Sequence, residues 1–148
     1  MKVAIQRVLK ANLTIQKKLH SKISKGIVVF IGIAHSDTIL DIPKFANKII
    51  KLRIFNDENQ KMNLSLLDIG GEILIVSQFT LYGECRKGNR PSFTKSASPE
   101  HAKKIYNEFV NYMHRKLKKV QTGEFGANMQ ISLVNDGPVT FIIETDEK

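Results

Sequence analysis

Cysteine is nearly absent from this chain of 148 residues, which contains one, Cys85. A single cysteine cannot form an internal disulfide or a cysteine metal site, and this favours a reducing compartment. Hydrophobic runs are short as well, because the longest, residues 26–34, falls far below the roughly 20 residues that span a bilayer. Lys2, Arg7 and Lys10 interrupt the apolar stretches at the N-terminus, so we expect no secretory signal peptide and no membrane partner. These absences indicate a cytoplasmic protein.

Internal repeats, low-complexity segments and Pro/Gly/Ser-rich linkers are also missing, so we expect a single domain over residues 1–148. The composition, with 42% hydrophobic and 25% charged residues, is typical of globular proteins. A chain of this length buries roughly 68–70% of its unfolded surface and needs no disulfide or metal to fold.

Positive charge dominates and is concentrated in one segment. The chain contains 23 Lys and Arg against 14 Asp and Glu, a net charge of +9. Residues 86–119 contain ten basic and two acidic side chains, or +8. Such a segment attracts polyanions, including nucleic acids, but it is equally typical of a solvated helix face.

Hydrophobic periodicity in the first half predicts strands at residues 1–9 and 13–16, and a strand buried on both faces at 26–34. The period then changes to that of a helix over residues 38–52, with Asp37 as a candidate cap.

In the second half a central strand is predicted at 72–80, followed by a long basic loop to residue 97. Ser98 is placed to cap a second helix, and strands are predicted at 128–134 and 139–145, separated by a break at 135–138. This order predicts a mixed α/β sheet with two helices on one face.

Most chemical templates are missing. The four histidines lack metal-ligand spacing, and Ser77 is not in a G-x-S-x-G turn. Phosphate-binding and dinucleotide-binding glycine motifs are absent too. Redox, phosphoryl-transfer and metal chemistry are therefore disfavoured, whereas a serine–histidine–aspartate triad stays open.

Three polar segments remain as candidate sites: 77–81 at a strand end, 122–129 and 135–140. Each also has a purely structural interpretation, as a fraying strand or a plain turn. Both the trans and the cis form of the Gly137-Pro138 peptide bond are compatible with the sequence. In a cis bond the two carbonyls would point the same way and could accept hydrogen bonds from an ammonium group while excluding one hand of an amino acid.

Four segments together resemble the D-aminoacyl-tRNA deacylases, also called D-tyrosyl-tRNA deacylases: 77–81 (SQFTL), 87–93 (KGNRPSF), 122–127 (TGEFGA) and 135–140 (NDGPVT). The resemblance implies a homodimer with a barrel-like sheet. It implies hydrolysis of the ester of D-aminoacyl-tRNA and of mischarged glycyl-tRNA, with L-aminoacyl esters spared. It also implies no metal or organic cofactor, and tRNA rather than DNA as the partner.

The resemblance assigns substrate binding to Gly137 and Pro138. They would hold the α-amino group in the neighbouring subunit's pocket through a cis bond, with Arg7 fixing their carbonyls. Phe79, Phe125 and Met129 would shape the pocket, although they also fit the description of ordinary core residues.

The catalytic candidates are Ser77, Gln78 and Thr80, with backbone N–H groups near Gln78 and Phe79 as oxyanion donors. Thr80 is a possible nucleophile, but no histidine or lysine is evident to activate it. We favour assistance by the 2′-hydroxyl of the terminal adenosine.

Arg86, Lys87 and Arg90 would contact tRNA phosphates. The alternatives are a nucleic-acid-binding module without catalysis and a small hydrolase of D-amino acid esters or peptides.

Overall fold

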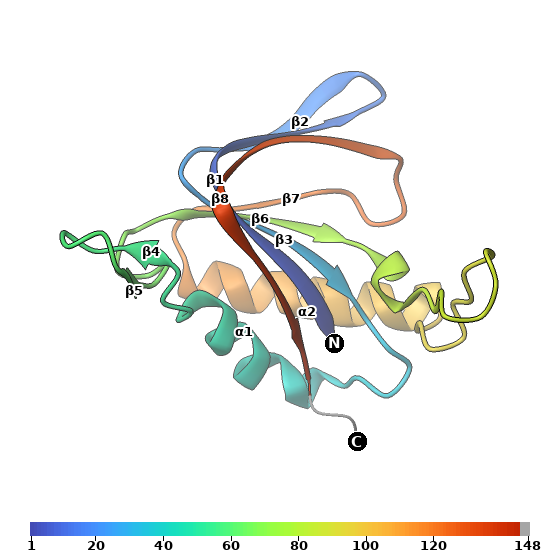
Figure 1. The fold of residues 1–148 in the computed structure, drawn as a ribbon. Helices are drawn as coiled ribbons and strands as arrows, with labels where there is room; N and C mark the ends of the chain where they lie inside the picture. The colour runs from blue at the N-terminus through green and yellow to red at the C-terminus, as the bar shows by residue number, and fades with distance from the viewer. Residues whose placement is uncertain (146–148) are drawn as a thin grey trace.

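One curved sheet organises the chain, and two helices cover the same face of it (Figure 1). The structure, a computed structural model, describes residues 1–145. In chain order the elements are β1 (Lys2–Ile15), β2 (Lys18–Ile23), β3 (Gly26–Gly32), the 3₁₀ turn η1 (Ile39–Asp41), α1 (Ile42–Ile50), β4 (Phe55–Asn56), β5 (Met62–Leu64), β6 (Glu72–Ser77), the 3₁₀ turn η2 (Phe79–Tyr82), α2 (Pro99–Lys116), β7 (Val120–Thr122) and β8 (Met129–Glu144).

The strand order is β2-β1-β3-β6-β7, and β8 pairs with β1. Strand β1 is antiparallel to β2, β3 and β8, whereas β6 is parallel to β3 and β7, the geometry that helical crossovers produce. Ser21 of β2 donates from Oγ to the carbonyl of Thr122 in β7 over 3.0 Å, which brings the two ends of the sheet together. The predicted mixed, barrel-like sheet with two helices on one face is confirmed.

Hydrophobic side chains pack on both sides of the sheet. On the helix side, Val3 and Ile5 of β1 pack in one cluster with Phe45 and Phe109 of the two helices. On the other side, the far half of β1 curls over the sheet and forms a second cluster, which contains Leu13, Val28, Leu74 and Val76. Strands β3 and β6 are buried from both faces for this reason.

The start of α2 follows the sequence prediction, because Ser98 Oγ accepts a hydrogen bond from His101 N over 3.4 Å. The prediction for α1 was wrong in one respect: Asp37 does not cap it, but accepts from the N–H of Ala34 at 2.7 Å. A 3₁₀ turn precedes α1, and Pro43 lies in the first turn of α1. Neither helix, nor any other in residues 1–145, is long and apolar enough to cross a membrane.

The strand predictions needed three corrections. Residues 1–9 and 13–16 belong to one 14-residue strand, β1, because β8 pairs along its whole length. Likewise 128–134 and 139–145 form one 16-residue strand, β8, and the segment 135–138 interrupts its register rather than ending it. The central strand stops at Ser77, where the chain turns into η2.

Four strands were not predicted. Strand β2 has mostly exposed residues and hence no apolar alternation. The β4–β5 hairpin and β7 contain two or three residues per strand, which is too short for a periodic pattern.

Candidate active site

The carboxyl end of β6 carries the first group of candidate residues. Residues 73–76 are buried, and the ladder with β3 extends to Ser77, which lies opposite Ile31. The N–H of Gln78 then donates to the carbonyl of Ile31 at 2.7 Å. This N–H is therefore already paired and is not available as the oxyanion donor that we predicted from the sequence.

The turn η2 offers two other backbone donors at the same place. Its first hydrogen bond runs from Leu81 N to the carbonyl of Gln78 at 3.3 Å. The N–H groups of Phe79 and Thr80 precede that bond, as the first N–H groups of any helical turn do. Backbone N–H groups of this kind are the donors that can bind an oxygen that carries negative charge.

Three side chains of this segment lie at the surface. The amide Nε2 of Gln78 donates to Thr80 Oγ1. The Phe79 ring is 57% exposed and meets the Phe93 ring edge-on, with 5.1 Å between their centroids. The end of β6 is thus an open ledge with an aromatic wall, an amide and a hydroxyl.

Arg7 and the segment 135–139 form the second group. Arg7 is buried, and its Nε donates to the carbonyl of Asp136 at 2.9 Å and pairs with the Asp136 carboxylate at 3.1 Å. Its Nη1 donates to the carbonyl of Ile54 at 2.6 Å. The Asn135 side chain adds bonds to the carbonyls of Arg7, at 3.0 Å, and of Val139, at 3.1 Å.

Gly137 and Pro138 are exposed within this braced segment, and the peptide bond between them is cis. The guanidinium of Arg7 contacts the carbonyl that precedes Gly137 rather than the carbonyls of Gly137 or Pro138 themselves. Arg7 thus holds the base of the segment, at Asp136.

Within one chain the two groups lie far apart. The segment 135–139 sits beside Gln6 of β1, which pairs with Val28 of β3, which in turn pairs with Leu74 of β6. Three strand spacings and four residues along β6 therefore separate it from Gln78, a distance of about 20 Å. A single copy does not bring these candidate residues into one pocket.

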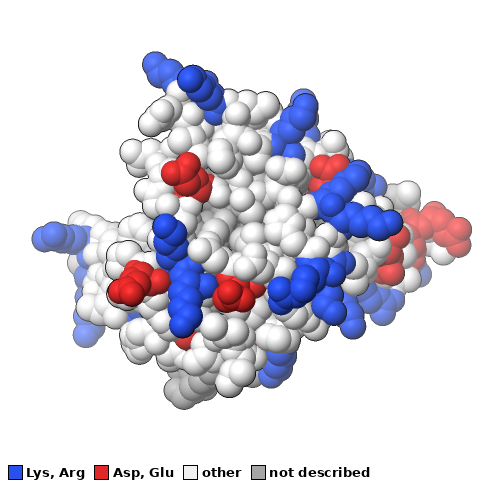
Figure 2. Space-filling view, turned by 180° about the vertical axis from the view of Figure 1, so that it is seen from behind, with Lys and Arg blue, Asp and Glu red and all other residues white. Residues whose placement is uncertain are grey.

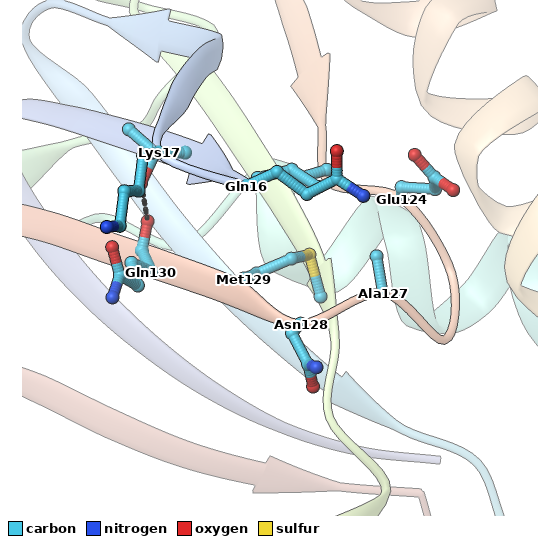
Figure 3. Close-up of a pocket in the computed structure, with 9 residues that line it drawn as sticks. Gln16, Lys17, Glu124, Ala127, Asn128, Met129 and Gln130 are labelled. Atoms are coloured by element: carbon cyan, nitrogen blue, oxygen red, sulfur yellow. Dashed lines mark hydrogen bonds between the residues drawn. The ribbon is translucent and has the colours of Figure 1, made fainter.

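Met129 and Phe125 lie on opposite sides of the sheet. Met129 lines a hollow of about 690 Å³ between the β1–β2 turn and residues 124–130, and packs against the cluster that contains Val76 (Figure 3). Phe125 packs on the helix side, where its ring lies 5.8 Å from that of Tyr106. Only Met129 therefore shares the face of β6 on which Gln78 projects.

The basic candidates lie in the loop after η2. Arg86 is exposed and donates from Nε to both oxygens of Glu84 at 2.9 Å. These hydrogen bonds from Arg86 hold the pKa of Glu84 at about 2. Lys87 and Arg90 are exposed at the tip of the loop, whose base is fixed by reciprocal bonds between Glu84 and Ser92. Lys87 and Arg90 are thus better placed than Arg86 for phosphates.

Sequence reasoning missed several groups that shape these sites. The carbonyl of Ile54 and the side chain of Asn56 hold Arg7 from a different part of the chain, and no motif pointed to them. Phe93 lies in a segment that carried the resemblance, but its contact with Phe79 has no signal in one sequence.

The structure thus combines a mixed α/β, barrel-like sheet with a polar ledge at the carboxyl end of β6 and a braced loop on β8. The family model for D-Tyr-tRNA(Tyr) deacylase matches residues 4–144. The chain belongs to this family.

Individual relatives agree with this assignment. The D-aminoacyl-tRNA deacylase of Thermosipho africanus (strain TCF52B) is 58% identical over 145 residues, 98% of this chain and 97% of that protein. The D-aminoacyl-tRNA deacylase of Flavobacterium psychrophilum is 54% identical over 149 residues, 100% of this chain and 99% of that protein. Among solved structures, the c-Myc DNA Unwinding Element Binding Protein superposes with a TM-score of 0.94 at 39% identity, covering 99% of this chain and 100% of its own.

Proposed function

We propose that the protein hydrolyses the ester bond of D-aminoacyl-tRNA in the cytoplasm and releases the D-amino acid and free tRNA. The observation that carries this proposal is the ledge at the end of β6, where exposed side chains surround two backbone donors. Family membership supports the substrate class.

Backbone donors and a ribose hydroxyl would drive the reaction. The N–H groups of Phe79 and Thr80 bind the ester carbonyl oxygen as it gains charge during the attack of water. The bond to the ribose 3′-oxygen then breaks, and that oxygen takes the proton that the water gives up. The neighbouring 2′-hydroxyl of the terminal adenosine orients the water and passes this proton.

Thr80 is a positioning residue in this scheme rather than the nucleophile. The partner of its Oγ1 is the Gln78 amide, which donates a hydrogen bond and cannot act as a base. A threonine nucleophile needs an adjacent base. Gln78 and Thr80 instead hold polar groups of the substrate, and Ser77 ends the strand beneath them.

Chirality would be selected by Gly137 and Pro138 of a second copy in a homodimer. The distance of about 20 Å within one chain supports this arrangement, because it leaves each ledge without a filter of its own. Within residues 1–145, strand β8 pairs with β1 alone and leaves its other edge unpaired. Exposed apolar side chains surround the braced segment: Leu9, Val134, Phe141 and Ile142.

The same filter predicts activity on glycyl-tRNA. The braced segment rejects an L-amino acid because its side chain would collide with Gly137 and Pro138. Glycine has no side chain, so a steric filter of this kind cannot reject it.

The acceptor-stem phosphates would be bound by Lys87, Arg90 and the exposed lysines of α2. Figure 2 shows Lys and Arg side chains, with Asp and Glu side chains among them, around a largely uncharged area on the face that contains α2. Phosphate contacts give affinity with little choice among tRNAs, which suits an enzyme that must accept many of them.

The test is hydrolysis of D-tyrosyl-, L-tyrosyl- and glycyl-tRNA by the purified full chain. We expect rapid loss of the D-tyrosyl and glycyl esters, with the L ester intact. Equal hydrolysis of the D and L esters would refute the chiral filter.

A second candidate is a nucleic-acid-binding module without catalysis. It rests on the +8 segment and on the similarity to the c-Myc DNA Unwinding Element Binding Protein. Tight tRNA binding without turnover of any of these esters would select it.

A further inference from the structure

A second hollow lies outside the ledge, between α2 and the chain that follows β7. It has a volume of about 370 Å³ and is lined by Lys103, Tyr106, Asn107, Val110, Asn111, Thr122, Gly123 and Phe125. We refer to it as the α2–β7 groove. Neither the hydrolysis nor the chiral filter described above uses it.

One wall of the groove is a row of polar side chains. Lys103, Asn107 and Asn111 are exposed and four residues apart, so they lie along one line of α2. Each amide offers a donor and an acceptor side by side, and Lys103 supplies a positive charge. Such a row can read the edge of a nucleobase and hold its phosphate at the same time.

The opposite wall is aromatic and fixed in place. The half-buried Phe125 ring packs 5.8 Å from Tyr106, at an angle of 50°. The Tyr106 hydroxyl donates to the carbonyl of Ile75 in β6 at 3.0 Å, which ties this wall to the strand that carries the ledge. Unpaired RNA bases are commonly held between an aromatic face and hydrogen-bonding side chains.

The groove is also close to the ester. Strand β7 runs parallel to β6, with Thr122 opposite Ile75, and Gln78 lies three residues beyond Ile75. Along the backbone Thr122 is therefore about 10 Å from Gln78, with the groove on the helix side of the sheet and Gln78 projecting from the other face. The unpaired nucleotides that precede the terminal adenosine can reach the groove around the carboxyl end of β6 when the ester occupies the ledge.

We propose that the α2–β7 groove binds one unpaired nucleotide of the tRNA 3′ end, upstream of the terminal adenosine. Asn107 and Asn111 contact the edge of its base, Phe125 contacts its face, and Lys103 binds its phosphate. This inference rests on tRNA being the substrate, and it assigns part of the enzyme's preference for RNA-linked esters to this groove.

The test compares D-tyrosyl-tRNA with the D-tyrosyl ester of adenosine alone, which lacks every upstream nucleotide. For the Asn107→Ala/Asn111→Ala protein we expect kcat/KM on the tRNA ester to fall about tenfold, through KM, with no change on the adenosine ester. Alanine favours the helix at both positions, so the fold is preserved. An equal loss on both esters, or no loss on either, would overturn the proposal.

The matched pair Lys103→Ala and Lys104→Ala separates the groove from general charge. Both residues are exposed on α2 and both variants lose one charge, but only Lys103 lines the groove. We expect the Lys103 variant to raise KM for the tRNA ester severalfold more than the Lys104 variant. Equal effects would contradict a specific nucleotide site.

Binding of uncharged tRNA tests the groove independently of catalysis. The wild-type protein should bind tRNA about tenfold more tightly than tRNA from which the unpaired 3′ nucleotides have been removed, and the double variant should bind the two equally. If this holds while no ester is hydrolysed, the proposed function fails but the groove stands. If the wild-type protein does not distinguish the two RNAs, the groove proposal is wrong.

Discussion

The end of β6 and the segment 135–139 are built in opposite ways. Phe79 and Thr80 are exposed, Gln78 is partly exposed, and few bonds beyond those of their own turn hold these residues. The segment 135–139 is equally exposed at Gly137 and Pro138, but a buried arginine and an asparagine side chain brace its base.

This difference fits the two tasks that we propose for these regions. A ledge that binds a reacting ester needs donors that point outward and space for the substrate. A filter that works by collision needs rigidity, because a flexible loop would yield to the wrong side chain. The bonds made by Arg7 and Asn135 supply that rigidity far from the ledge of the same chain.

Breaking the filter itself should have the largest effect. A Cβ atom at Gly137 would lie 2.4 Å from Asn135 Oδ1 and 3.0 Å from Val139 N, so Gly137→Val must displace the Asn135 side chain. We expect hydrolysis of D-tyrosyl-tRNA to fall about 100-fold or more, while the loss of the Asn135 bonds, each worth about 1 kcal/mol, lowers the thermal transition by only a few degrees. The control is Ser132→Val, an exposed position on the same strand; unchanged hydrolysis in Gly137→Val would refute the role of the segment.

Removing the brace should cost stability as well as activity. Arg7→Ala leaves the carbonyls of Ile54 and Asp136 without their charged donor. We expect the free energy of unfolding to fall by about 2–4 kcal/mol in urea denaturation. Lys10→Ala, an exposed change on the same strand, should cost almost nothing, and an equally small loss in Arg7→Ala would show that the brace is not needed.

Added salt should weaken the binding of tRNA without acting directly on the ledge or on the segment 135–139. If Lys87, Arg90 and one or more lysines of α2 contact phosphates, KM for D-tyrosyl-tRNA should rise about tenfold or more between about 50 and 200 mM salt. The D-tyrosyl ester of adenosine should show a flat response. A flat response for the tRNA ester too would contradict the assignment of phosphate binding to this face.

Thr80→Ala should have the smallest effect. Because the partner of Thr80 is an amide and not a base, we expect kcat/KM on D-tyrosyl-tRNA to fall by less than about tenfold. Thr94→Ala, in the exposed loop, serves as the control. Complete inactivity of Thr80→Ala, with the fold and tRNA binding intact, would make Thr80 the nucleophile.

Local patterns in the sequence predicted much of the fold. The apolar run at 26–34 and the Ser98 cap each depend on neighbours along the chain, and both predictions were confirmed. Strand β2 and the continuity of β8 depend on pairing with β1. Local periodicity carries no information about which strands pair.

The candidate residues of the site were likewise named from motifs, but their arrangement was not. Whether the segment 135–139 lies near Gln78 is decided by the register of four strands, and this register places them about 20 Å apart. The bond that occupies the Gln78 N–H also comes from the neighbouring strand. The prediction that Gly137 and Pro138 act in a neighbouring subunit came only from the resemblance, because local patterns carry no information about this distance.

Mixed dimers test that central claim most directly. Gly137→Val removes the filter, and Phe79→Glu places a carboxylate on the ledge, at a side chain that is 57% exposed and so does not support the core. Each variant alone should be inactive. After co-expression, about half of the dimers are mixed, each with one intact site, so about a quarter of wild-type activity on D-tyrosyl-tRNA should return. No recovery from mixed dimers whose formation has been verified would show that the ledge and the filter do not come from different copies.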